Sequence, residues 1–126
     1  MPPRILVVDD EPDLRKIIER GLELSGCDVD SSEDPTHTLN VFQPGKYDMV
    51  ILDVGMPEMN GFELYERLAK LDSHIKVCFL TAYDMEYFRE FRQRFPDVPD
   101  SCFIRKPVAI KDLADIVKSQ LATFTE

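Results

Sequence analysis

Short apolar runs alternate with helix-like stretches along this chain, and this alternation constrains the fold more than any other feature. Strongly apolar runs lie at 5–8, 49–52, 77–80 and 102–104, and a weaker strand is expected at 28–31. Runs of this length without polar alternation are typical of strands covered on both faces. They predict the strands of a parallel sheet.

The stretches between these runs carry apolar residues at helical spacing. The first helix is expected to start at Pro12 and to stop at Gly26. Further helices are expected at 35–42, 61–71, 84–95 and 110–121. Strands that alternate with helices predict an α/β fold, doubly wound, with helices on both faces of the sheet. Five strands and five helices fit residues 1–126 as a single domain.

Polar residues follow the carboxyl ends of the apolar runs. Asp9 and Asp10 come after the first, Asp53 after the run at 49–52, Thr81 after the next and Lys106 after the last. In a parallel sheet these ends share one edge, where ligands bind. We therefore expect three carboxylates, one hydroxyl and one ammonium to meet in a single pocket.

Carboxylates gathered in this way repel one another. Two unit charges ~4 Å apart cost roughly 4 kcal/mol at an effective dielectric of ~20. A hard cation removes that cost, and sites built from oxygen ligands alone suit Mg²⁺. A phosphoryl donor on the metal could then place its phosphorus in line with an Asp53 oxygen. Lys106 would pair with phosphoryl oxygens, and Thr81 would donate a hydrogen bond to one of them.

At these positions the chain resembles the response-regulator receiver family, and the resemblance covers its whole length. The matching stretches are Ile5-Leu6-Val7-Val8-Asp9-Asp10-Glu11-Pro12, Ile51-Leu52-Asp53-Val54-Gly55-Met56-Pro57 with Asn60-Gly61, Leu80-Thr81-Ala82 and Lys106-Pro107. Each motif is weak alone, whereas the set in this order is specific. The resemblance implies a flavodoxin-like sheet with strand order 2-1-3-4-5.

The resemblance also implies a metal site and a phosphorylation site. Asp53 corresponds to the phosphorylated aspartate. Asp10 corresponds to a direct Mg²⁺ ligand, Asp9 to one that acts largely through water, and Gly55 to a ligand through its backbone carbonyl.

Three further residues correspond to the family's switch. Thr81 and Lys106 match its phosphate-sensing pair, and Phe103 matches its switch aromatic, although a plain core aromatic is the competing interpretation of Phe103. The Lys106–Pro107 peptide is commonly cis in the family, and X-Pro bonds adopt cis at little cost.

The implied function is a signalling switch and not an enzyme. A sensor histidine kinase or a phosphotransfer protein would supply the phosphoryl group, and the conformation would change near the fifth strand and the fourth and fifth helices. An unidentified effector would read that change, and the same face offers a homodimer contact.

Composition limits the classes of partner and the cellular compartment that we expect for this chain. The net charge of −9 argues against nucleic acid as the main partner. No apolar run reaches the ~18 residues that span a bilayer, and no signal peptide is evident, so a cytoplasmic location without membrane contact is expected. Cys27, Cys78 and Cys102 show no zinc-ligand spacing and are expected to be buried thiols in a reducing compartment.

Three other functions compete with the switch. An aspartyl-phosphate phosphatase of the haloacid-dehalogenase type needs a second acid two residues after its nucleophile, where this chain has Gly55. A flavodoxin-like FMN module needs a hydroxyl- and glycine-rich loop where the chain has Asp9 to Glu11. A receiver-like scaffold used only for protein contacts would not need the intact acceptor residues.

Two features depart from the family pattern. Most receivers carry a Gly-Ala pair before the last strand, but residues 95–101 contain two prolines and no glycine. Prolines restrict the backbone and end the preceding helix. The sequence therefore does not predict the shape of the surface through which the fourth helix and the last strand would contact a partner. Gly55 and Tyr83 would border the phosphoryl group, with opposite effects on the access of water.

Overall fold

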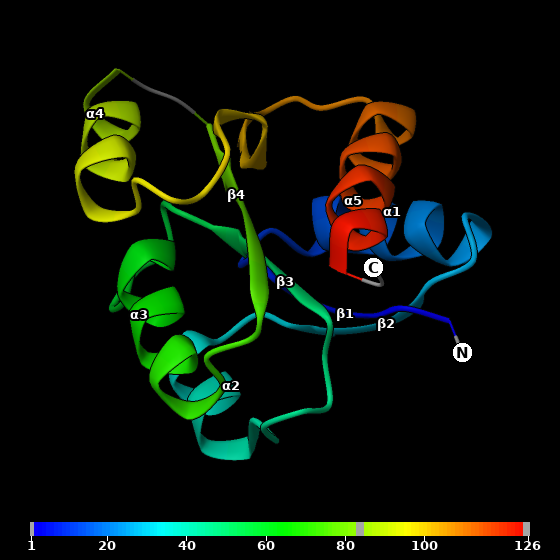
Figure 1. The fold of residues 1–126 in the computed structure, drawn as a ribbon, viewed down its shortest axis with the longest axis horizontal. Coiled ribbons are helices and arrows are strands. Elements are labelled where there is room, and N and C mark those ends of the chain that lie inside the picture. The colour runs from blue at the N-terminus through cyan, green and yellow to red at the C-terminus, as the bar shows by residue number, and fades with distance from the viewer. Residues whose placement is uncertain (1, 83–84, 125–126) are drawn as a thin grey trace.

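Parallel strands form one sheet at the centre of the protein (Figure 1). The computed structural model describes residues 2–82 and 85–124. The strands are β1 (Arg4–Val8), β2 (Asp28–Ser32), β3 (Met49–Asp53), β4 (Lys76–Thr81) and β5 (Phe103–Arg105). Their order is β2-β1-β3-β4-β5, as predicted. The chain therefore reverses its direction across the sheet between β1 and β3, and ligands of such sheets bind beside that reversal.

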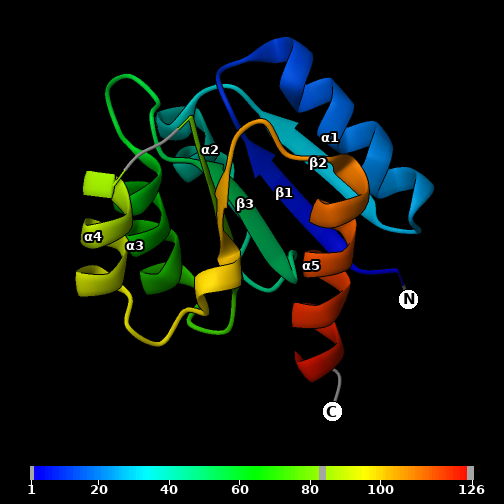
Figure 2. The same cartoon turned by 90° about the horizontal axis from the view of Figure 1, so that it is seen from above.

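Helices cover both faces of the sheet. They are α1 (Pro12–Leu24), α2 (Pro35–Val41), α3 (Gly61–Leu71), α4 (Met85–Arg94) and α5 (Ile110–Phe124). Figure 2 shows α1 and α5 on one side of the sheet and α2, α3 and α4 on the other. None of the helices in the described part of the chain is long and apolar enough to cross a membrane.

Side-chain alternation along β1 divides the core into two clusters. Ile5 and Val7 pack with the apolar faces of α1 and α5, whereas Leu6 and Val8 pack with those of α3 and α4. All four side chains are buried, which is why β1 carries no polar alternation. The three cysteines are free and buried, as predicted from the sequence.

The last strand begins later than expected. Cys102 belongs to a short 3₁₀ turn, η1 (Asp100–Cys102), because its N–H donates to the carbonyl oxygen of Pro99 at 2.9 Å. β5 therefore starts at Phe103, one residue after the apolar run does. The expected start of the fourth helix at residue 84 lies outside the described residues, which resume within α4 at Met85.

Arg92 of α4 organises the proline-rich connection that follows it. Its Nη2 donates to the carbonyl oxygens of Phe95 at 3.1 Å, Pro96 at 3.0 Å and Val98 at 3.2 Å, and its Nη1 pairs with the carboxylate of Asp100. Carbonyl groups at a helix end lack intrahelical partners, and a guanidinium satisfies several at once. One side chain thus shapes a segment that contains no glycine.

The loop after β3 lies tightly against the end of that strand. A Cβ atom on Gly61, the first residue of α3, would lie 2.5 Å from the backbone carbonyl oxygen of Asp53. The side chain of Asn60 caps α3 by accepting from the N–H of Glu63 at 2.9 Å, and the Glu63 carboxylate accepts from the N–H of Asn60. Together these contacts fix the backbone that follows Asp53.

Candidate phosphoryl-acceptor and metal site

Four strands deliver polar side chains to one edge of the sheet. Asp9 and Asp10 follow β1, Asp53 ends β3, Thr81 ends β4 and Lys106 follows β5. One oxygen from each of the three aspartates lies within 4.8 Å of the others. The juxtaposition expected from the strand pattern is therefore present, although up to 97 residues separate its members in the sequence.

Asp53 is buried at the centre of this edge, with 4% of its surface exposed. Its Oδ1 accepts from the N–H of Gly55 at 3.1 Å and lies 3.4 Å from the Lys106 ammonium. Burial and the negative charge of Asp9 raise the pKa of Asp53 to about 6, against the opposing effect of Lys106. The carboxylate is ionised near neutral pH, and its charge is costly there.

Asp9 is fully buried and lacks a second well-aligned partner. Its Oδ1 accepts from the N–H of Glu11 at 2.8 Å. Among the described residues, its Oδ2 accepts no hydrogen bond of good geometry, although the ammonium of Lys106 lies 3.1 Å away. A buried carboxylate oxygen that accepts no hydrogen bond lowers the stability of the fold unless a cation compensates its charge.

The ammonium of Lys106 is the positive charge within this group of acids. It lies 2.6 Å from Glu11 Oε1 and also contacts Asp9 and Asp53. Burial alone would lower the pKa of Lys106, but the hydrogen bond to Glu11 and the charges of Asp53 and Asp9 raise it. The backbone N–H of Lys106 also donates to the carbonyl oxygen of Thr81 at 2.7 Å, which joins β5 to the end of β4. The Lys106–Pro107 peptide is cis.

This group of residues fits a divalent cation. Three aspartates with one lysine leave an excess of negative charge, and the Oδ2 atom of Asp9 has an unfilled acceptor position. Oxygen is the only donor element in the set, as hard cations such as Mg²⁺ prefer. Gly55 lines the same pocket and has no side chain to obstruct its backbone carbonyl.

Thr81 and Phe103, the two residues expected to act in the switch, differ in their relation to the pocket. Thr81 is buried at the end of β4 and lines the pocket. Phe103 on β5 is half-buried and stacks on Phe91 of α4, with ring centroids 4.9 Å apart. Its ring therefore packs against α4. Tyr83, the other residue expected to border a phosphoryl group, lies outside the described residues.

The pocket itself is open to solvent and has a volume of about 450 Å³. Its lining residues are Asp10, Glu11, Asp53, Gly55, Thr81, Ala82, Tyr87 and Lys106. Four of the five residues expected at the strand ends line it, whereas Asp9 is fully buried and does not.

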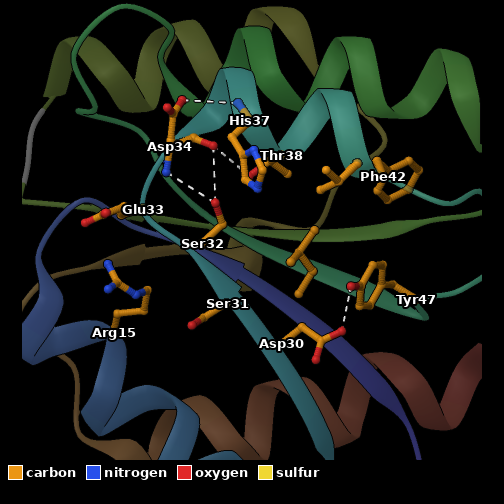
Figure 3. Close-up of a pocket in the computed structure, with 12 residues that line it drawn as sticks. Arg15, Asp30, Ser31, Ser32, Glu33, Asp34, His37, Thr38, Phe42 and Tyr47 are labelled. Atoms are coloured by element: carbon orange, nitrogen blue, oxygen red, sulfur yellow. Dashed lines mark hydrogen bonds between the residues drawn. The ribbon is translucent and has the colours of Figure 1, made fainter.

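A larger hollow of about 540 Å³ lies beside β2 and α2 (Figure 3). Two of its three carboxylates are engaged in structural contacts. Asp34 accepts from the N–H of Thr36 at 2.9 Å and caps α2, and Asp30 accepts from the hydroxyl of Tyr47 at 2.7 Å. Within the described part of the chain, no lysine lines this hollow. Size alone therefore does not identify the reactive site.

Two charged residues at or beside the site were not predicted from the sequence. Glu11 occupies the N-cap position of α1, but its side chain makes no capping bond and reaches Lys106 instead. Arg15, one helical turn further on, donates from Nη1 to the carbonyl oxygen of Asp9 at 2.8 Å. An acid directly before a helix is typical of a cap, and nothing local indicates a partner 95 residues away.

Comparison with known proteins agrees with this geometry. The family model described as "Response regulator receiver domain" matches residues 5–118. PrrA, a transcriptional regulatory protein of Mycobacterium tuberculosis, is 38% identical over 80 residues, which are 64% of this chain and 34% of PrrA. The response regulator MprA of Mycolicibacterium vanbaalenii is 30% identical over 125 residues, which are 99% of this chain and 53% of MprA. The chain thus spans about a third to a half of these relatives.

A solved structure with similar architecture is TrrA of Thermotoga maritima, described as a response regulator protein in complex with Mg²⁺–BeF. It is 32% identical, the match covers 93% of this chain and 97% of TrrA, and the TM-score is 0.76.

Proposed function

This chain belongs to the response regulator receiver domain family, and from that premise we propose that Asp53 accepts a phosphoryl group in a Mg²⁺-dependent reaction. Receivers of this family are phosphoryl-accepting switches of two-component systems and take the phosphoryl group from sensor histidine kinases. One observation carries the assignment to Asp53. It is the buried carboxylate that ends β3, grouped with Asp9 and Asp10 and 3.4 Å from Lys106.

In the proposed reaction, an Asp53 oxygen attacks the phosphorus of a phosphohistidine. A phosphorus–oxygen bond forms, the phosphorus–nitrogen bond breaks, and its electron pair returns to the donor imidazole. Lys106 neutralises the negative charge of the transferred group, and Thr81 donates a hydrogen bond to it.

We assign the cation site to the carboxylates of Asp9, Asp10 and Asp53 and the backbone carbonyl of Gly55. Bound Mg²⁺ would supply charge neutralisation for the phosphoryl oxygens. The chain's own part is to hold the carboxylates together. The N–H of Glu11 orients Asp9, and the N–H of Gly55 orients Asp53.

We propose Thr81, Lys106 and Phe103 as the residues that read the phosphoryl group. New bonds from Thr81 and Lys106 to its oxygens are worth about 1.5–3 kcal/mol each. Inversion of a 1:99 population needs about 5.5 kcal/mol, which two such bonds approach. Movement of Thr81 would give space to Phe103, whose ring stacks on Phe91, so the change would reach β5, α4 and α5.

The remaining expectations are proposals of the same kind. Residues 1–126 would form one receiver domain in the cytoplasm, where three free thiols suit a reducing compartment. A phosphotransfer protein is the alternative donor of the phosphoryl group. We also propose a homodimer through α4, β5 and α5, whose mass light scattering would measure. The net charge of −9 supports an effector contact through protein and not through nucleic acid.

Intact mass after incubation with acetyl phosphate and Mg²⁺ tests the acceptor. Wild type and Asp30→Asn, whose carboxylate lies in the other hollow, should each gain one phosphoryl group. Asp53→Ala and wild type in chelator should gain none. A phosphoryl group on Asp53→Ala would contradict the assignment.

A further inference from the structure

Glu11 lies at the mouth of the acidic pocket and holds the lysine that a phosphoryl group needs. We propose that Glu11 competes with the phosphoryl group for Lys106 and thereby lowers the affinity of the site for that group. Glu11 is a positioning residue in this proposal, because it acts through Lys106. The inference rests on the proposed function of Asp53.

Three carboxylates surround the ammonium of Lys106, and the one on Glu11 accepts a hydrogen bond from it. The Lys106 Nζ atom lies 2.6 Å from Glu11, 3.1 Å from Asp9 and 3.4 Å from Asp53. An ammonium has no fourth donor. One donor is engaged by Glu11, so Lys106 can direct all its donors to a phosphoryl group on Asp53 only if the Glu11 contact is lost.

The Glu11 contact is the cheaper one to lose. Asp9 is fully buried, so the departure of Lys106 would leave its Oδ2 atom without a compensating charge. The side chain of Glu11 is 59% exposed, so water can replace Lys106 around its carboxylate. Glu11 also makes the shortest of the three contacts, so it sets how readily Lys106 turns toward a new anion.

The negative charge of Glu11 also lowers the affinity of the site for a phosphoryl group. A phosphoryl group brings about −1.5 to −2 charges at neutral pH. Glu11 adds one further negative charge to a pocket that already contains Asp9, Asp10 and Asp53. Removal of that charge therefore both weakens the contact that holds Lys106 and reduces repulsion.

The backbone of Glu11 is held independently of its side chain. Its N–H donates to Asp9 at 2.8 Å, and its carbonyl oxygen accepts from the N–H of Arg15 at 3.0 Å. The side chain makes no capping bond to α1. Replacement of its carboxylate by an amide should therefore leave the start of α1 in place.

Beryllofluoride titration in Mg²⁺ measures this competition without phosphoryl turnover. Glu11→Gln should bind beryllofluoride about two- to fivefold more tightly than wild type, the range for an ion pair with one solvent-exposed partner. Glu11→Asp keeps the charge but withdraws it by one methylene group, and it should lie between them. Asp13→Asn removes one charge from the first turn of α1 and serves as the matched control, with wild-type affinity expected.

Salt separates competition from a merely structural effect. Ion pairs with an exposed partner are screened by salt, so the advantage of Glu11→Gln should shrink between about 0.05 and 0.5 M NaCl. An unchanged or weaker affinity in Glu11→Gln, or an equal gain in Asp13→Asn, would overturn the proposal. Wild type that neither binds beryllofluoride nor gains phosphoryl mass would instead overturn the function of Asp53 on which it rests.

Discussion

The backbone of Gly61 approaches Asp53 so closely that a Cβ atom at residue 61 would lie 2.5 Å from the Asp53 carbonyl oxygen. The neighbour in this contact is backbone, which cannot turn away as a side chain can. The first turn of α3 and the end of β3 are therefore built around the absence of a side chain. The glycine matters to the site because it determines where the Asp53 carboxylate is held.

Replacement of Gly61 by alanine should lower the free energy of unfolding by about 1–3 kcal/mol, the usual cost of overpacking. Urea denaturation followed by circular dichroism measures the change. Gly55→Ala is the matched control for stability, because no atom lies within 4 Å of a Cβ atom at that position. Equal stabilities of the two variants would show that the strand end moves freely to accept a methyl group.

Asp53→Asn should stabilise the metal-free protein at neutral pH. The pKa of Asp53 is raised from 3.8 to about 6, so the folded protein binds this proton more tightly than the unfolded chain does. The contribution of Asp53 to stability is thus fully present below about pH 4 and is lost as the pH rises through about 6. Removal of the charge should add up to about 3 kcal/mol at pH 8.

Thermal unfolding from pH 4 to 8 tests that prediction. The difference between Asp53→Asn and wild type should grow with pH in chelator and shrink when Mg²⁺ is added. Asp115→Asn, an exposed change on α5, should show no such trend. A difference that is independent of both pH and Mg²⁺ would argue against a charge effect at Asp53.

Arg92→Ala should loosen the connection between α4 and β5. The variant loses bonds to three carbonyl oxygens and the pairing with Asp100, and we expect a loss of about 1–3 kcal/mol in unfolding free energy. Hydrogen exchange should rise at the N–H groups of Val98 and Cys102. Arg89→Ala, an exposed change on the same helix, is the control and should leave exchange there unaltered.

Glu58 adopts a left-handed backbone conformation with φ of 70° in the loop after β3. A side chain in this region costs about 1–2 kcal/mol, which glycine avoids at a smaller cost in chain entropy. Glu58→Gly should therefore stabilise the protein by about 0.5–1 kcal/mol in urea denaturation, whereas Glu58→Ala should not. A destabilised Glu58→Gly would show that the side chain of Glu58 has a contact worth more than the strain.

Much of the fold could be predicted because its signals are local. A strand buried on both faces must be apolar throughout, so β1, β3 and β4 were visible as apolar runs. The start of α2 also has a local signal, since Pro35 is its first residue and the side chain of Asp34 before it accepts from the N–H of Thr36. The start of β5 was placed one residue early, since an apolar Cys102 does not reveal the turn closed by its bond to Pro99.

The members of the site could be predicted from the topology of the sheet, although their individual contacts could not. Parallel strands bring their carboxyl ends to one edge whatever the loops between them contain, so Asp53 and Lys106 could be placed together. The clamp formed by Arg92 could not be found in this way. It depends on how the backbone folds back after α4, and no pattern in residues 95–101 indicates which side chain meets those carbonyl groups.

The sequence by itself determined where most of the strands lie and which strand ends carry polar side chains, because hydrophobic periodicity and strand polarity are properties of the chain. Only the tertiary structure decided how those side chains pair. Lys106 lies between Glu11, Asp9 and Asp53 because charges separated along the chain interact through space. Burial then determined the strength of these charge interactions, and burial depends on the packing of the whole sheet and its helices.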